Sequence, residues 1–160
     1  MAEVQIGDQA PDFTLPTDGN GEITLSAFRG QKVILYFYPK DDTPGCTAES
    51  CAFRDALPAF ESLGTQIIGI SKCSVKKHNA FKEKYDLNFP LASDENADTC
   101  ERYGTWIEKS MYGRKYMGID RSTFLIDENG TITAIWRKVK VPGHIEEVRK
   151  ELETLKKAAA

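Results

Sequence analysis

The sequence predicts an α/β fold, in which a central mixed β-sheet is flanked by helices. Segments 32–38 and 66–70 are short and almost continuously apolar, as strands buried on both faces are. Each is followed by a segment with helical spacing of apolar residues, and a strand–turn–strand pattern near the end precedes a last amphipathic helix. The chain of 160 residues has the size of one domain, so we expect a single domain over residues 1–160.

The first thirty residues predict a small N-terminal hairpin. Turn signals, including Asp18-Gly19 and Asn20-Gly21, separate short alternating segments there. The apolar run KVILYFY at 32–38 then predicts the first buried strand, which Pro39 ends.

Helices and a second buried strand are expected in the middle of the chain. Residues 44–63 have helical spacing, with Pro58 inside the helix expected to kink it. The run QIIGI at 66–70 predicts the second buried strand. An amphipathic helix over 74–85 and a short helix over 95–103 follow.

The last third predicts a hairpin and a helix. STFLID begins at residue 122, and the Asn129-Gly130 step separates it from TITAIWRK, which is a strong hairpin signal. Residues 143–157 then place Ile145, Val148 and Leu152 on one helix face. The order strand, helix, strand, helix, hairpin, helix is the topology of the thioredoxin fold, so we expect a thioredoxin-like sheet preceded by the N-terminal hairpin.

Charge and cysteine content narrow the function classes. A formal net charge of −3 gives no reason to expect nucleic acid or an anionic membrane as a partner. The start of the chain does not look like a signal peptide and no segment looks like a membrane span, so we expect a cytoplasmic protein. In a reducing compartment, four cysteines indicate catalytic or buried thiols, and their spacing fits no metal site; we expect no metal and no cofactor.

The candidate site lies in PKDDTPGCTAESC, residues 39–51. Thr43 is a suitable N-cap and Pro44 suits the first turn, which places Cys46 within that turn. Unpaired backbone N–H groups and the helix dipole stabilise an anion there, so they favour a reactive thiolate at Cys46. The alternative is a small residue packed behind a turn.

Cys51 is the candidate partner of Cys46 or, alternatively, a core cysteine on the inner face of the helix. In an intact helix, residues five apart have Cα atoms about 8.6 Å apart. A disulfide needs a Cα separation below about 7 Å. Either Cys51 is not the partner, or the first turns of the helix unwind during the reaction.

The run FYPKDDTPGCTAESCAFRD resembles the active-site signature of the peroxiredoxin family, in particular the peroxiredoxin Q or bacterioferritin comigratory protein subgroup. The resemblance extends over nearly the whole chain and includes GIDRSTFLID. It implies the thioredoxin fold, a peroxidatic Cys46 and a resolving Cys51 in the same helix. It also implies hydroperoxide substrates, reduction by thioredoxin or a similar dithiol, and a monomer.

Further residues of this signature receive roles from the resemblance and from chemistry. We expect the Thr43 hydroxyl, the backbone N–H of Cys46 and the Arg121 guanidinium to donate hydrogen bonds to the peroxide oxygens. Pro39 would shape the pocket and limit water. A solvated arginine is the alternative for Arg121. Glu49 matches a supporting position near the arginine, although the residue pattern alone indicates a glutamate on the helix surface.

The two other cysteines fall outside this signature. Cys73 follows the second buried strand, and we interpret it as a chance substitution or an engineered cysteine rather than a second reactive thiol. Cys100 is most simply a core thiol. His78 and His144 are interpreted as helix residues rather than general bases.

Two rival functions remain from the sequence. A thioredoxin-class thiol–disulfide oxidoreductase normally needs two cysteines that can bond in the folded state, which the spacing of Cys46 and Cys51 disfavours. A non-catalytic interaction domain on the same fold would not depend on Cys46.

Overall fold

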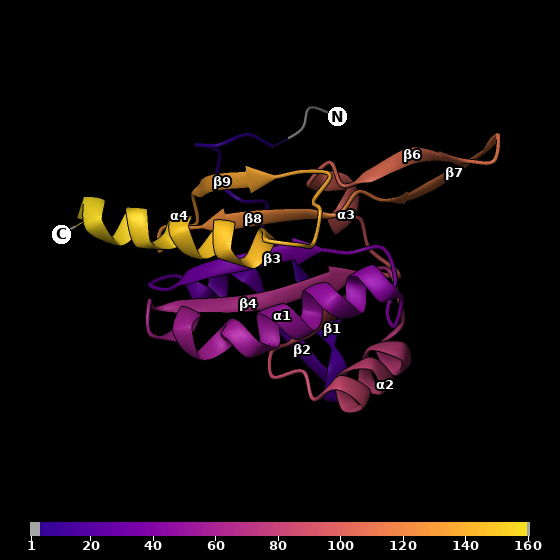
Figure 1. Cartoon of the computed structure of the whole chain (residues 1–160), viewed down its shortest axis with the longest axis horizontal. Helices are drawn as coiled ribbons and strands as arrows, with labels where there is room; N and C mark the ends of the chain where they lie inside the picture. Colours follow the sequence, from indigo (N-terminus) through magenta and orange to yellow (C-terminus); the bar gives the residue numbers. More distant parts are fainter. Residues whose placement is uncertain (1–3, 160) are drawn as a thin grey trace.

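The computed structural model describes residues 4–159, and its central sheet has seven strands (Figure 1). These strands are β1 (Thr14–Thr17), β2 (Gly21–Thr24), β3 (Lys32–Phe37), β4 (Thr65–Ser71), β5 (Leu91–Ser93), β8 (Ser122–Ile126) and β9 (Ile132–Trp136). A separate hairpin consists of β6 (Trp106–Met111) and β7 (Arg114–Ile119). The helices are α1 (Pro44–Glu61), α2 (Val75–Tyr85), α3 (Thr99–Arg102) and α4 (His144–Ala159), with 3-10 turns η1 (Asp18–Asn20) and η2 (Leu25–Phe28).

The sheet is mixed, as predicted, with the order β2-β1-β5-β4-β3-β8-β9. β3 and β4 are parallel neighbours at its centre, and β8 pairs with β3 in the antiparallel direction. The predicted N-terminal hairpin, β1 and β2, extends the sheet beyond β5. Because β3 and β4 run in the same direction, the segments after Phe37 and Ser71 emerge at the same edge of the sheet.

Both faces of the sheet are covered, which explains why β3 is apolar at almost every position. Ile34 and Tyr36 pack on the face covered by α1 and α4, whereas Leu35 and Phe37 pack against the N-terminal segment and α3. Figure 1 shows α1 and α4 side by side over the first of these faces. In the described part of the chain, no helix combines the length and the apolar composition needed to cross a bilayer.

Helix α1 continues through Pro58 to Glu61 as one element, and the kink expected at Pro58 stays a prediction. A proline at position 58 cannot donate a hydrogen bond to the carbonyl of Arg54 four residues earlier. The side-chain nitrogen of Asn88 donates to that carbonyl instead, at 3.2 Å. The lost helical hydrogen bond is therefore replaced from outside the helix.

Two elements differ from the sequence prediction. The short helix predicted over 95–103 is confined to α3, because the Asp94 carboxylate accepts hydrogen bonds from the backbone N–H groups of Thr99 and Cys100 and fixes the helix start there. The β6–β7 hairpin was not predicted. Its turn residues Tyr112 and Gly113 both have positive φ, the backbone of a two-residue turn, and the hairpin projects from the body (Figure 1).

Candidate active site

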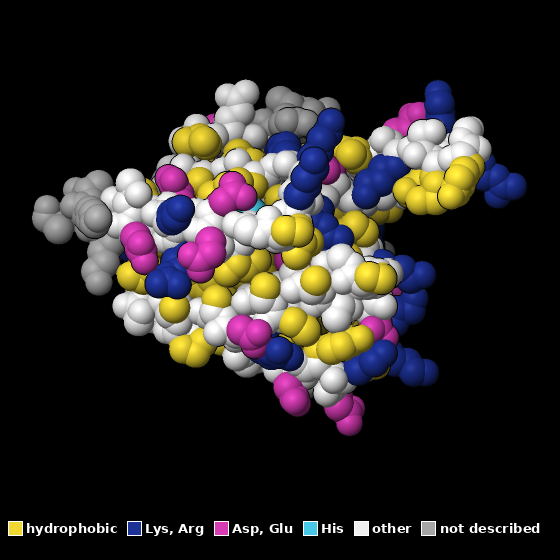
Figure 2. All heavy atoms as spheres, in the orientation of Figure 1, with side chains coloured by type: hydrophobic (Ala, Val, Ile, Leu, Met, Phe, Trp, Pro, Cys, Tyr) yellow, Lys and Arg dark blue, Asp and Glu magenta, His cyan; other side chains and the backbone are white. Residues whose placement is uncertain are grey.

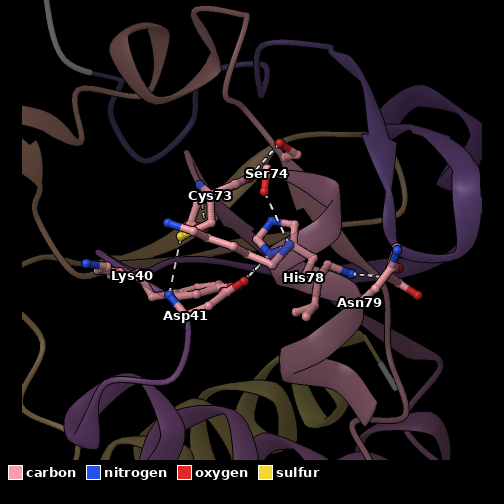
Figure 3. Close-up of polar contacts among 12 residues, drawn as sticks. Lys40, Asp41, Cys73, Ser74, His78 and Asn79 are labelled. Carbon is pink, nitrogen blue, oxygen red and sulfur yellow. Dashed lines mark hydrogen bonds and ion pairs between the residues drawn. The ribbon is translucent and has the colours of Figure 1, made fainter. Parts of the chain in front are cut away.

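A buried hydrogen-bond network holds the loop between β3 and α1 in place (Figure 3). The Asp41 carboxylate accepts from Tyr38 Oη at 2.6 Å and contacts His78 Nδ1 at 2.6 Å. His78 Nε2 lies 3.0 Å from the carbonyl oxygen of Ala92, so both ring nitrogens face oxygen atoms of the protein. The backbone N–H of Asp41 donates to Cys73 Sγ at 3.4 Å. This network ties the loop before α1 to α2 and to the ends of β4 and β5.

Thr43 takes the N-cap position of α1 with extended backbone dihedrals, and Pro44 begins the helix as predicted. The expected side-chain cap is absent, however. The Thr43 hydroxyl donates to the carbonyl oxygen of Lys40 at 2.9 Å instead. Its single proton is therefore engaged within the loop, and its lone pairs remain available to accept a hydrogen bond.

Cys46 lies in the first turn of α1, and its side chain is fully buried. Arg121, directly before β8, donates from Nη2 to Cys46 Sγ at 3.1 Å. A Cβ atom on Gly45 would lie 3.1 Å from the same nitrogen, so glycine at this position lets the guanidinium reach the sulfur. Sequence reasoning missed Gly45, although it lies next to Cys46.

Glu49 is fully buried, so its interpretation as a helix-surface glutamate was wrong. Its Oε1 accepts a hydrogen bond from Arg121 Nη1 at 2.8 Å, one helical turn from Cys46. Arg121 thus contacts Cys46 with one nitrogen and Glu49 with the other. Burial alone would lower the pKa of Arg121, but the charges of Glu49 and Cys46 outweigh it and raise that pKa.

Cys51 lies further along the same intact helix and is half-buried, and the four cysteines are free thiols. The helical geometry puts its Cα about 8.6 Å from that of Cys46, beyond disulfide reach. Ser50, its neighbour, has its hydroxyl 2.8 Å from Tyr36 Oη in the core. The structure therefore shows α1 intact, with no disulfide between Cys46 and Cys51.

Comparison with known proteins decides the family. Residues 6–135 match the AhpC/TSA family. The chain belongs to this family. It is 54% identical over 145 residues to the putative peroxiredoxin Bcp of Coxiella burnetii, covering 91% of this chain and 96% of the relative. It is also 47% identical over 153 residues to peroxiredoxin Bcp of Bacillus subtilis, covering 96% of each.

Solved structures agree with the family assignment. A cysteine-to-serine mutant of PrxQ from Xylella fastidiosa has a TM-score of 0.90 at 41% identity, covering 100% of each chain. The bacterioferritin comigratory protein of Xanthomonas campestris, studied for its alkyl peroxide reduction activity, has a TM-score of 0.85 at 42% identity and covers 89% of this chain and 90% of its own. The chain is therefore a peroxiredoxin enzyme of the Bcp subgroup with a thioredoxin-like fold.

Two residues outside the signature have different surroundings in this peroxiredoxin. Cys100 is fully buried in the core, as predicted, and burial raises the pKa of its thiol, with the Asp94 carboxylate adding to the effect. Cys73 is nearly buried, at 9% exposure, and contacts the loop before α1. Nothing in the structure explains why a cysteine rather than another small residue stands there.

The carboxyl group of Glu49 gives this peroxiredoxin a pH-dependent stability. Burial raises the pKa of Glu49 from 4.5 to about 7, although Arg121 opposes the change. Between these two values the folded state holds a proton that the unfolded state has lost, so this contribution to stability falls as pH rises through the window. Across the whole window the free energy of unfolding falls by about 3 kcal/mol through this group.

Glu49→Gln should remove this pH dependence. Urea unfolding of wild type and variant between about pH 5 and about pH 8 measures the difference in their free energies of unfolding, and wild type should lose stability relative to the variant as pH rises. His144 has a pKa lowered to about 4, mainly by burial and further by Arg121, so its contribution has the opposite sign. It is present in both proteins and cancels in the difference. A difference that stays constant across the range would contradict the assignment.

Proposed function

We propose that this peroxiredoxin reduces hydrogen peroxide and organic hydroperoxides with Cys46 as the attacking thiolate. The observation that carries the proposal is the contact between Arg121 and Cys46 Sγ at 3.1 Å, with Arg121 held by the buried Glu49. A fixed positive charge beside the sulfur stabilises the thiolate, which is the nucleophilic form of cysteine. The first-turn N–H groups of α1 act in the same direction.

The reaction begins when the Cys46 thiolate attacks one peroxide oxygen and breaks the O–O bond. Cys46 becomes a sulfenic acid, and the second oxygen leaves as alkoxide or hydroxide and takes up a proton to give an alcohol or water. Arg121 and the backbone N–H of Cys46 stabilise the developing negative charge. The Thr43 hydroxyl accepts a hydrogen bond from the peroxide O–H, because its own proton goes to Lys40. Pro39, beside the loop, shapes the pocket and limits water.

Cys51 resolves the sulfenic acid in the second step. Its thiol attacks Cys46 sulfur, water leaves, and an intramolecular disulfide remains, which thioredoxin or a similar dithiol reduces by thiol–disulfide exchange. A thioredoxin-class oxidoreductase is the rival function. This rival is disfavoured because the two cysteines of such an oxidoreductase must form a disulfide within the folded state. Cys46 and Cys51 lie too far apart in α1 to do so. We further propose a single-domain monomer in the cytoplasm, with neither cofactor nor metal in the reaction.

Disulfide formation requires the first turns of α1 to unwind. This breaks the Arg121–Glu49 ion pair and the contact between Ser50 and Tyr36. We predict that amide hydrogen exchange over residues 45–51 is fast in the oxidised protein and slow in the reduced one. Helix α2 serves as the internal control and should keep its protection. Equal protection of residues 45–51 in both forms would rule out local unfolding.

Thioredoxin-coupled turnover of wild type and Cys51→Ser tests the proposed cycle. Wild type should consume peroxide continuously. Cys51→Ser should react with the first equivalent as fast as wild type and accumulate a sulfenic acid that a specific trapping reagent labels, while coupled turnover falls to a small fraction of the wild-type rate. Full turnover in the variant would show that Cys51 is not the resolving cysteine. Turnover of disulfide substrates without peroxide would favour the oxidoreductase.

A further inference from the structure

The β6–β7 hairpin holds most of the large apolar side chains that are exposed to solvent. In the described part of the chain five such side chains are exposed, and four of them belong to this hairpin: Met111, Tyr112, Tyr116 and Met117. Tyr112, at the tip, is 99% exposed, so no other described part of the chain covers it. Large apolar side chains gathered on one projecting element indicate a surface that binds another molecule.

Basic side chains alternate with these apolar ones. The register pairs Met111 with Arg114 and Tyr116 with Lys109, and cross-strand partners lie side by side on one face of a hairpin. Residues 106–119 include three basic residues and one acidic residue, a net charge of +2 on a chain whose net charge is −3. Figure 2 shows hydrophobic and basic side chains next to one another on the projecting hairpin. Its surface is therefore both apolar and cationic.

The hairpin stands at the end of the molecule where α1 begins. Trp106, at its base, lines a cavity together with Pro39, which lies in the loop between β3 and α1. Arg121, two residues after the end of β7, contacts Cys46 Sγ at 3.1 Å. Cys46 and Cys51 both belong to the first half of α1. A protein bound to the hairpin would therefore also lie beside the segment that holds the two cysteines.

The charge of the hairpin decides between two possible occupants. A closed dimer uses the same patch on both subunits, so a second copy of this chain would bring two hairpins of net charge +2 together. An acidic partner gains from the same charges. The proposed mechanism already requires a partner at this end of the molecule, because a dithiol has to reach the disulfide of Cys46 and Cys51 to reduce it.

We propose that the β6–β7 hairpin is the docking site of the thioredoxin-like protein that reduces this disulfide. The partner has an apolar surface around its cysteines that contacts Met111 and Tyr112, and carboxylates around that surface that pair with Lys109 and Arg114. The inference rests on the proposed peroxidase function and deepens it by saying where the reductant binds.

The hairpin holds the partner while two electrons pass to the peroxiredoxin. One thiolate of the partner attacks the disulfide, forms a mixed disulfide and displaces one of the two cysteines as a thiolate. The partner's second thiolate then attacks the mixed disulfide and displaces the other cysteine. Cys46 and Cys51 leave reduced, and the partner leaves with a disulfide of its own.

The test compares two reductants of the same disulfide, thioredoxin and dithiothreitol, which is too small to need the hairpin. Tyr112→Asn removes the exposed ring and leaves Asn-Gly, which suits the positive φ of both turn residues, so the hairpin should persist. We expect kcat/KM for thioredoxin to fall about tenfold and reduction by dithiothreitol to stay unchanged. Ile6→Ser is the matched control, because Ile6 is the exposed large apolar side chain outside the hairpin, beside the start of β9. It should change neither rate.

Reversing a charge tests the chemistry assigned to the partner. Arg114 is exposed directly after the turn, where Arg114→Glu places an anion beside Met111. We expect this variant to lower kcat/KM for thioredoxin about tenfold at low ionic strength, and the difference from wild type to shrink as salt is added. A reversal without effect at low ionic strength would contradict an acidic partner.

The outcomes separate this inference from the proposed function. Equal kcat/KM for thioredoxin in Tyr112→Asn and Ile6→Ser overturns the docking site, and so does a loss of dithiothreitol-coupled turnover in Tyr112→Asn. A wild-type dimer in light scattering that Tyr112→Asn dissociates would assign the hairpin to a second copy instead. Absence of peroxide turnover by wild type with dithiothreitol would overturn the peroxidase itself. Turnover with dithiothreitol but none with thioredoxin would overturn only the docking.

Discussion

Replacing Cys46 with serine is expected to lower peroxide turnover to the rate of peroxide with thioredoxin alone. Serine keeps nearly the same volume in this fully buried position, so the fold should persist. Its hydroxyl does not ionise near neutral pH and is a far weaker nucleophile than a thiolate, even beside Arg121. Thioredoxin-coupled peroxide consumption measures the effect, with circular dichroism to confirm folding.

Cys100→Ser is the matched control for this variant. Cys100 is also fully buried, and its side chain is hydrogen-bonded to the Asp94 carboxylate, to which a serine hydroxyl could donate. The control should retain turnover. Turnover that survives Cys46→Ser would overturn the proposed mechanism and direct attention to Cys73, the other cysteine near the loop before α1.

Replacing Arg121 with glutamine should lower the second-order rate constant of Cys46 with hydrogen peroxide about a hundredfold. The loss follows from removing a charged donor 3.1 Å from the sulfur, and one such donor contributes about 10²–10³ in comparable sites. Arg121→Lys should be only a partial substitute. The two nitrogens of the guanidinium donate separately to Cys46 and Glu49, and a single ammonium group cannot reproduce this geometry.

A second variant separates chemistry from stability in this experiment. Arg121→Gln leaves Glu49 buried without its partner, which destabilises the fold as well as the thiolate. The double variant Arg121→Gln/Glu49→Gln removes the stranded carboxyl group. Stopped-flow reaction of each reduced variant with hydrogen peroxide gives the rate constants. If the double variant reacts as fast as wild type, Arg121 acts on stability rather than on the sulfur.

The sequence was sufficient for the elements whose residues are apolar with a clear period. The buried strands β3 and β4, helix α1 and the β8–β9 hairpin are of this kind. The β6–β7 hairpin was missed because its strands are largely exposed, which leaves no apolar face to recognise, and because Tyr112-Gly113 is a weaker turn signal than Asn-Gly. The short extent of α3 depends on the Asp94 carboxylate, which accepts a hydrogen bond from the backbone N–H of Thr99, five residues later in the sequence.

The site was predictable where its chemistry is local. Cys46 follows from a helix start, whereas its contact with Arg121 joins residues 75 positions apart and came only from the family resemblance. The burial of Glu49 had a signal that was overlooked: it lies three residues after Cys46 and so shares its helix face. The hydrogen bonds of His78 to Asp41 and Ala92 depend on three separate segments, and no local pattern predicts them.

The most direct test of the mechanism is peptide mapping by mass spectrometry after one equivalent of hydrogen peroxide. Reduced wild-type protein is oxidised, its remaining thiols are alkylated, and the disulfide-linked peptides are identified. The mechanism predicts one bond, between Cys46 and Cys51, with Cys73 and Cys100 alkylated. A disulfide that includes Cys73 or Cys100, or oxidation that leaves Cys46 alkylated as a free thiol, would contradict it.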